Sequence, residues 1–361
     1  MKILIAGDFC PRHRVSALME QGRYEEILGE VKPIVEAADF SLVNFECPVV
    51  ENPNAKPIPK CGPNLRTSAK AVDLIKWAGF KGVTLANNHF LDYGEEGVAD
   101  TLHALDSAGI AHVGGGMSLT EASQIMYVEG DCGKVAIVNC CEHEFSIATD
   151  TSAGSNPLNP VQQWYAIREA RKSADYVIVI VHGGHEHYQL PSPRMQELYR
   201  YFIDCGADAV VNHHQHCYSG YEHYHGKPIF YGLGNFCFDA GAAASTFWHE
   251  GFMLQIAIAS DGLECWMIPY RQCAEQPAVV VLKERSAFDD RIEEVNAVIA
   301  DQQQLRQHHE QWMESSNRWI KTLFSPYTNG YLRAACSRGW LPSFLSKKKT
   351  AMIYNYLNCE A

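Results

Sequence analysis

Short apolar runs rich in β-branched residues recur along the chain and alternate with segments of helical periodicity. The runs are KILIAGD, FSLVNFE, KGVTLANNH, KVAIVNC, DYVIVIVHGG, DAVVNHH and KPIFYGLGNF. Runs that are apolar on both faces are typical of strands covered on both sides. Between them, residues 67–80, 95–110 and 192–207 place apolar residues three and four apart and finish at or near glycine, a usual helix end. The alternation predicts a layered α/β architecture.

Two segments stand apart from this alternation. Residues 47–66 contain five prolines, so they cannot form a helix or a central strand and are expected to be a long irregular loop. Beyond residue 275 a long helical stretch begins near Ser286. We therefore expect an α/β domain over residues 1–275 and a helical C-terminal extension over residues 276–361.

Charge and cysteine usage exclude several classes of protein. The formal net charge of -12 argues against a nucleic-acid partner, because phosphate binding needs a basic surface. No apolar run approaches the roughly 20 residues that cross a bilayer, so we expect no transmembrane segment. The thirteen cysteines form no CxxC pair, which favours a reduced, cytoplasmic setting over a disulfide framework.

Polar side chains stand where five of the predicted strands end. They are Asp8, then Asn44 with Glu46, then Asn88 with His89, then His182, and finally His213, His214 and His216. In open α/β sheets the ligand crevice lies outside the carboxyl ends of the strands, so these residues should converge. A lone histidine at a strand end is more often a hydrogen-bonded structural residue. Five strand ends that behave alike instead predict a metal centre for Zn, Mn or Fe.

Six motifs in order resemble those of the CapA family of poly-γ-glutamate capsule biosynthesis proteins. They are GDF, VNFECPV, LANNHFLDYGEEGV, HGGHEHY, NHHQH and GKPIFYGLGNFCFD, and they cover about residues 1–260. This family looks like a branch of the calcineurin-like metallophosphoesterase superfamily. The resemblance implies a four-layer αββα sandwich of metallophosphoesterase type, with a two-metal site at the strand ends.

The resemblance also implies a role for individual residues. Matched position by position, the residues expected to bind divalent metal are Asp8, Glu46, Asn88, His182, His214 and His216, with Glu46 at the bridging position. His89 matches the histidine that assists the leaving group and does not bind metal.

The sequence departs from the superfamily pattern in the first two motifs. Cys10 stands where a histidine is usual, and Asn44-Phe45-Glu46 replaces a Gly-Asp pair. Cys10 is either a soft ligand or a packed core thiol, so we expect one or two metal ions per chain. His213 occupies a position usually held by glycine and is assigned to substrate contact.

Positive charges near the predicted site suit an anionic substrate, either a small molecule or a polymer. Ordinary solvated loop charges are the alternative. The residues are Arg12, Arg14, Lys56, Lys60 and Arg66, of which we assign Lys60 and Arg66 to substrate binding. His185 and Glu186 match a family segment near the site and are assigned to substrate contact together with Asn44.

Two functions of different classes follow. The first is metal-dependent hydrolysis of a phosphoester or a related anionic substrate in capsule or poly-γ-glutamate biosynthesis, with His89 as the proton donor. The second is a non-catalytic component of a surface-polymer assembly system that binds an anionic chain or a partner protein. The segment RGWLPSFLSKKK in the C-terminal extension, which mixes aromatic residues and lysines, gives the second hypothesis some support.

Overall fold

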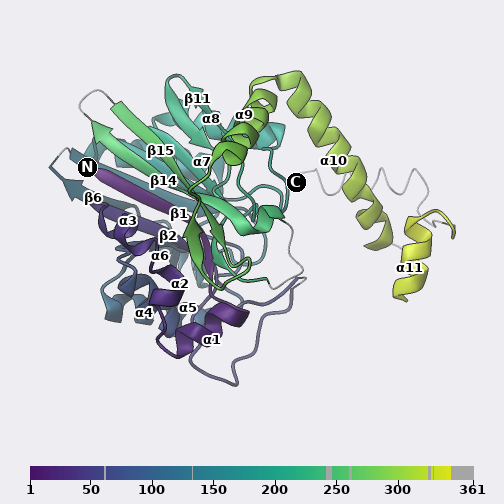
Figure 1. Ribbon diagram of the computed structural model, residues 1–361, viewed down its shortest axis with the longest axis horizontal. Coiled ribbons are helices and arrows are strands. Elements are labelled where there is room, and N and C mark those ends of the chain that lie inside the picture. Colours follow the sequence, from purple (N-terminus) through teal and green to yellow (C-terminus); the bar gives the residue numbers. More distant parts are fainter. Residues whose placement is uncertain are drawn as a thin grey trace. The chain divides into compact units, whose positions relative to one another are not determined.

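The computed structural model describes residues 1–361 except 61, 132, 241–245, 260–261, 324–326, 328 and 343–361. The chain divides into two compact units, Met1–Ala300 and Asp301–Ala361. The first unit contains two large sheets and most of the helices (Figure 1).

The first sheet has eight strands, in the order β16-β15-β14-β1-β2-β3-β4, with β13 also paired to β1. Strands β1 to β4 are parallel, and β13 runs parallel to β1, whereas β14, β15 and β16 are antiparallel additions at one side. The strands are β1 (Lys2–Cys10), β2 (Phe40–Phe45), β3 (Gly82–Thr84), β4 (Ala111–Val113), β13 (Asn235–Phe238), β14 (Glu250–Ala259), β15 (Gly262–Gln272) and β16 (Val279–Val281).

The second sheet has six strands, in the order β11-β12-β10-β9-β7-β6. Its four central strands are parallel, and each edge strand is antiparallel to its neighbour. The strands are β6 (Met126–Gly130), β7 (Gly133–Cys141), β9 (Tyr176–His182), β10 (Ala209–His213), β11 (Tyr221–Tyr224) and β12 (Lys227–Phe230). A small two-stranded sheet pairs β5 (Gly115–Gly116) with β8 (Gly154–Ser155).

The two sheets pack face to face between two layers of helices. Alternate residues of β1 point to opposite faces: Ile3 and Ile5 join a core with residues of the second sheet, whereas Leu4 packs among the helices on the outer face. That outer layer is α1 (His13–Glu20), α2 (Glu25–Leu28), α3 (Lys32–Glu36), α4 (Lys70–Trp77) and α5 (Gly94–Ala108) (Figure 1). The second sheet is covered by α7 (Pro160–Ser173) and α8 (Pro193–Cys205). The predicted α/β class and αββα layering are confirmed.

Capping residues explain where the long helices begin and end. Ser192 accepts a hydrogen bond from the backbone N–H of Met195 at the start of α8, and α8 ends at Gly206 with φ of 120°. Helix α5 likewise ends at Gly109 with φ of 70°, as the glycine pattern predicts. Two short helices complete the unit, α6 (Leu119–Ala122) and the 3₁₀ helix η1 (Thr246–His249).

One run that the sequence analysis counts as a single strand is split between the sheets. Residues 227–236 form β12 in the second sheet and then β13 in the first. The break falls at Gly234, whose φ of +79° is a conformation that L side chains rarely adopt. This crossing brings the start of β13 beside β1.

The boundary between the compact units lies at residue 300, not at the expected residue 275. Residues 276–300 belong to the first unit because β16 pairs with β15, and because Phe288 and Ile292 of α9 (Ser286–Ala300) pack in the core between the sheets. In the second unit, α10 (Gln302–Leu323) and α11 (Gly330–Ser337) give the extension its expected helical character. Most of the segment RGWLPSFLSKKK lies outside the described residues. None of the described helices combines the length and apolar character needed to cross a membrane.

Candidate metal centre

The predicted site residues converge where parallel strands of both sheets end. Asp8 on β1 pairs in register with Asn44 on β2 and with Asn235 on β13. In the second sheet, His182 at the end of β9 is the register partner of His213 at the end of β10. The carboxyl ends of both sheets therefore contribute to one site, as expected for an α/β architecture.

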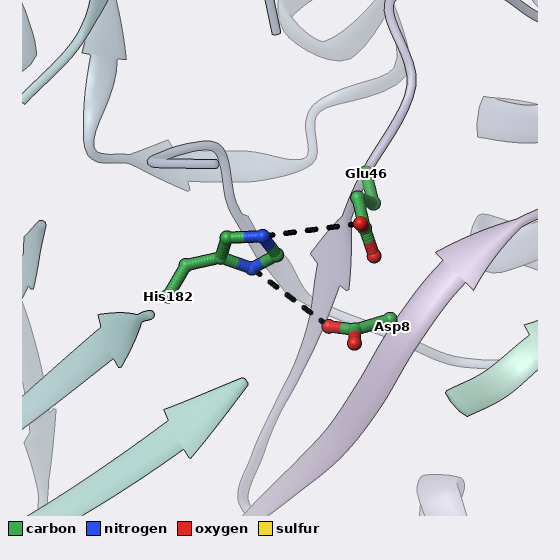
Figure 2. A group of neighbouring side chains, drawn as sticks. All are labelled: Asp8, Glu46 and His182. Atoms are coloured by element: carbon green, nitrogen blue, oxygen red, sulfur yellow. Dashed lines mark ion pairs between the residues drawn. The ribbon is translucent and has the colours of Figure 1, made fainter. Parts of the chain in front are cut away.

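Two buried carboxylates and one imidazole form the centre of the site. One ligand atom from each of Asp8, Glu46 and His182 lies within 4.8 Å of the other two. In Figure 2 the ring of His182 faces both acids. Its Nδ1 lies 3.9 Å from Asp8 Oδ1, and its Nε2 lies 3.8 Å from Glu46 Oε1. Burial would raise the pKa of Asp8, but the neighbouring imidazoles of His213 and His216 hold it well below the ordinary value.

Glu46 provides a direct test of whether this centre suits a cation. Both of its carboxylate oxygens are buried, and neither has a hydrogen-bond partner among the described residues. Burial, reinforced by the charge of Asp8, raises its pKa well above the ordinary value. A buried carboxylate without a partner is costly unless a positive charge compensates it. The residues present therefore fit a bound divalent metal ion.

Asn88 and His214 contact His182 at Nε2, the ring nitrogen that also faces Glu46. The Nε2 atom of His182 lies 3.0 Å from Asn88 Oδ1 and 3.1 Å from His214 Nδ1. Imidazole nitrogen, amide oxygen and carboxylate oxygen together are a donor set suited to Zn, Mn or Fe. The structure thus brings these predicted ligands around a common point.

His216 completes the predicted ligand set beside Asp8 and Glu46. Its Nε2 lies 3.5 Å from Glu46 Oε1, and its Nδ1 lies 3.5 Å from Asp8 Oδ2. Nδ1 is also 2.9 Å from the side-chain oxygen of Asn235. A hydrogen bond from Nδ1–H to Asn235 would fix the ring and leave Nε2 to face a metal.

The backbone at the histidine cluster is held in an unusual conformation. His214 and His216 have φ of 89° and 54°, in the left-handed region that non-glycine residues rarely adopt. Such conformations cost free energy and are found mainly at functional sites. The surrounding hydrogen bonds include one from the His214 backbone N–H to Asp8 Oδ2 at 3.3 Å.

His89 lies beside the metal-binding residues in a hydrogen-bonded group of its own. Its Nδ1 is 2.7 Å from Asp92 Oδ2 and 3.0 Å from the Lys60 ammonium, which also contacts Asp92. Burial lowers the pKa of His89, although Asp92 opposes this effect. Because Nδ1 is occupied by Asp92, Nε2 is the ring nitrogen left to face a substrate.

The residues assigned to substrate contact are not all at the centre. Asn44 and His213 are buried beside Asp8, and the Asn44 amide donates to Asp8 Oδ1 at 2.8 Å and lies 3.2 Å from His182 Nδ1. Asn44 therefore orients two predicted metal ligands, and its role in substrate contact stays a prediction. Lys60 is buried against Asp92 and is not part of an exposed rim.

The remaining residues of the predicted substrate group are more exposed. Arg66 is exposed, and its guanidinium lies 5.5 Å from the centre of the Tyr93 ring. His185 is half-buried and Glu186 is exposed in the segment after β9. The negative charge of Glu186 interacts with Glu46 and contributes to raising the pKa of Glu46.

The contacts of Arg14 and Cys10 indicate that both residues stabilise the fold. Arg14 Nη2 lies 2.9 Å from Asp239 Oδ1, and its guanidinium also donates to backbone carbonyls, so it is not a free charge for substrate. Cys10 packs in a buried cluster with Cys47, Leu65 and Phe238. Burial and the neighbouring Cys47 raise the pKa of the Cys10 thiol well above its ordinary value, which disfavours a thiolate ligand.

The sequence analysis missed two acidic residues that follow β7. Glu142 Oε1 lies 2.7 Å from His214 Nε2, and Glu144 Oε2 accepts a hydrogen bond from Asn88 Nδ2 at 2.8 Å. Burial alone would lower the pKa of His214, but the Glu142 carboxylate raises it to about 9. The sequence does carry a signal for them, because KVAIVNC is followed directly by CEHE, just as the other apolar runs are followed by predicted ligands.

Comparisons with known proteins agree with the motifs. A model of the family described as Bacterial capsule synthesis protein PGA_cap matches residues 2–240. The chain is 33% identical over 249 residues to "Capsule biosynthesis protein CapA" of Bacillus anthracis, covering 67% of this chain and 60% of that protein. It is 35% identical over 238 residues to "PGA biosynthesis protein CapA" of Bacillus subtilis, covering 65% of this chain and 62% of that protein.

Solved structures with a similar fold include one titled a novel phosphatase, from Mycoplasma pneumoniae. The two align with a TM-score of 0.46 and 14% sequence identity, over 74% of this chain and 92% of that one.

All six predicted metal ligands lie inside the segment that the family model matches. The chain belongs to the bacterial capsule synthesis protein family PGA_cap.

Proposed function

We propose that this chain is a metal-dependent hydrolase that acts on a phosphoester or a related anionic substrate in capsule or poly-γ-glutamate biosynthesis. The observation that carries the proposal is Glu46, a buried carboxylate without a hydrogen-bond partner, between the imidazoles of His182 and His216. The names of the two Bacillus relatives support the biosynthetic setting. The chain spans about 60% of their length, so their activities are a guide only.

The residues that would hold metal are Asp8, Glu46, Asn88, His182, His214 and His216. We propose one or two ions of Mn, Fe or Zn, because the donor set is imidazole, carboxylate and amide oxygen. A bound ion would lower the pKa of a water molecule and so supply a nucleophile near neutral pH. Asn44 and Asn235 orient the metal-binding side chains through the hydrogen bonds described above.

His89 would deliver a proton to the leaving group. Its Nδ1 is held by Asp92, which fixes the ring and leaves Nε2 to face the departing oxygen. Lys60 forms an ion pair with Asp92. The further residues proposed to contact the substrate are Arg66, His185, Glu186 and His213. Lys60 is buried and Arg14 is paired, whereas Arg66 is exposed and available to meet an anionic group.

A second candidate function is a non-catalytic component of a surface-polymer assembly system that binds an anionic chain or a partner protein. The observation that favours it is in the second unit, where Tyr331 and Trp340 are 89% and 75% exposed. Exposed aromatic side chains suit a protein interface.

We place the protein in the cytoplasm because ten of its described cysteines are free thiols. Its acidic net charge argues against a nucleic-acid partner.

One experiment separates the two functions. Protein purified without a histidine tag is assayed for bound metal and for metal-dependent hydrolysis of a panel of phosphoesters and γ-glutamyl compounds. We expect bound metal and turnover, with turnover lowered about 10²–10⁴-fold in His89→Ala at unchanged metal content. The matched control is His223→Ala, an exposed histidine on β11. Bound metal without turnover on any substrate would favour the binding component.

A further inference from the structure

His213 has a buried side chain that makes no hydrogen bond with the described residues. The residue is 2% exposed, and neither ring nitrogen has a hydrogen-bond partner in the described part of the chain. A buried polar group left unsatisfied destabilises a fold, so each such group calls for a reason. Its Nδ1 faces Asp8 Oδ1 at 3.5 Å.

That separation is too long for a hydrogen bond between a ring N–H and a carboxylate. Asp8 Oδ1 already accepts a hydrogen bond from Asn44, and Oδ2 accepts one from the backbone of His214. Two ligand atoms that each lie about 2.1 Å from one tetrahedral zinc ion stand about 3.4 Å apart. The distance between His213 and Asp8 therefore suits two ligands of one ion. The same separation of 3.5 Å recurs between His216 Nε2 and Glu46 Oε1, two predicted ligand atoms.

The metal position next to Asp8 otherwise has few donors. Asp8, Glu46 and His216 surround it, and a closed tetrahedral site takes four ligands. Cys10, the nearby residue that could have supplied a sulfur ligand, is packed with Cys47, Leu65 and Phe238. Water can complete such a site, and a fourth protein donor would have to come from another element.

We propose that His213 is a metal ligand, which binds the same ion as Asp8 in place of the donor that Cys10 does not provide. This inference rests on the proposed metal site and replaces the assignment of His213 to substrate contact.

The backbone of His213 is well suited to this role because it is fixed from several sides. The residue ends β10 in register with His182, and its carbonyl oxygen accepts hydrogen bonds from the Gly183 N–H and from the side chain of Asn212. Asn212 Nδ2 also donates to the carbonyls of Gly183 and Tyr231. A ligand on a rigid strand end needs little rearrangement to bind an ion.

The test compares His213→Leu with His213→Asp, which keeps a metal-binding oxygen, and with Cys10→Ala. Each protein is stripped with chelator, titrated with zinc or cobalt, and assayed for equivalents bound and for the visible absorption of the cobalt form. Circular dichroism establishes that each variant is folded. We expect His213→Leu to lose one equivalent, or to bind more than about 100-fold more weakly, beyond the range of an outer-shell change. His213→Asp should recover part of the loss, and Cys10→Ala should bind like the wild type.

A structure of the zinc-loaded wild-type protein gives an answer that needs no variant. A ring nitrogen of His213 should lie about 2.0–2.1 Å from an ion, and a ring that is turned away from both ions would overturn the inference. The inference also fails if His213→Leu binds metal like the wild type while His182→Ala does not, and the proposed function then stands. If the wild-type protein binds no metal, both fail.

Discussion

The ammonium nitrogen of Lys60 lies 3.0 Å from Nδ1 of His89 and also contacts the carboxylate of Asp92. Lys60 comes from the proline-rich segment 47–66, yet its side chain is only 2% exposed. Asp92 Oδ2 in turn accepts a hydrogen bond from the backbone N–H of Leu65 in the same segment. The proline-rich segment is therefore bound to Asp92, the residue that also contacts Nδ1 of His89.

Removing the Lys60 charge should destabilise the protein. In Lys60→Met the buried Asp92 carboxylate loses its ion pair, which costs about 3–5 kcal/mol when one partner of a buried pair is removed. Urea denaturation measures the change in the free energy of unfolding. The exposed Lys56→Met variant is the matched control and should lie within about 0.5 kcal/mol of the wild type. Equal stabilities for the two variants would show that the Lys60 contact contributes nothing.

Metal removal should lower the thermal stability. A ligand that binds only the folded state stabilises it by about 2.7 kcal/mol when present at 100 times its dissociation constant. The effect is expected because the buried carboxylate of Glu46 has no hydrogen-bond partner among the described residues. Differential scanning calorimetry with and without chelator measures it, and His182→Ala should remove most of the difference. A melting temperature independent of metal would contradict the site.

Glu142 should strengthen metal binding without being required for folding. Its carboxylate contacts Nε2 of His214, which leaves Nδ1 of that ring directed toward His182. Loss of such an outer partner lowers metal affinity about 10–100-fold. Competition with a chromogenic chelator should detect this weakening in Glu142→Gln. The exposed Glu169→Gln on α7 is the control, and an equal affinity in both variants would mean that Glu142 does not orient His214.

Asn139 should stabilise the packing of the two sheets. It lies on β7, where its side-chain oxygen accepts from the Ala86 N–H beyond β3 of the first sheet and its amide donates to the Ile180 carbonyl on β9. Asn139→Ala leaves two buried backbone groups unsatisfied, at about 1–3 kcal/mol each. Guanidinium denaturation should show that loss, whereas the exposed Asn54→Ala should be neutral. A loss below about 1 kcal/mol would mean that water replaces the amide.

The convergence of the candidate site residues could be predicted from the sequence because these residues follow a simple rule, that polar residues end apolar runs. The rule places Asp8, Glu46, Asn88 and His182 where the structure has them. It also applies to Glu142 and Glu144, which were not predicted although they directly follow the apolar run of β7.

Other features have no local signal. The helical pattern of residues 286–300 does not indicate which surface the helix packs against. These residues belong to the first unit because Phe288 and Ile292 are buried in its core. A lysine in a proline-rich loop looks solvated, and only the position of Asp92 explains why Lys60 is buried. The change of sheet at Gly234 likewise depends on the approach of two distant backbones.

The pairing of His182 with His213 has a consequence for protein engineering. Adjacent parallel strands lie about 4.8 Å apart whatever chain joins them, so the spacing between these two imidazoles is set by the register of β9 and β10. Substitutions on the exposed side of α8, such as at Glu197 and Asp204, are therefore expected to leave this spacing unchanged. A slip of β10 by a single residue, in contrast, would turn His213 to the opposite face.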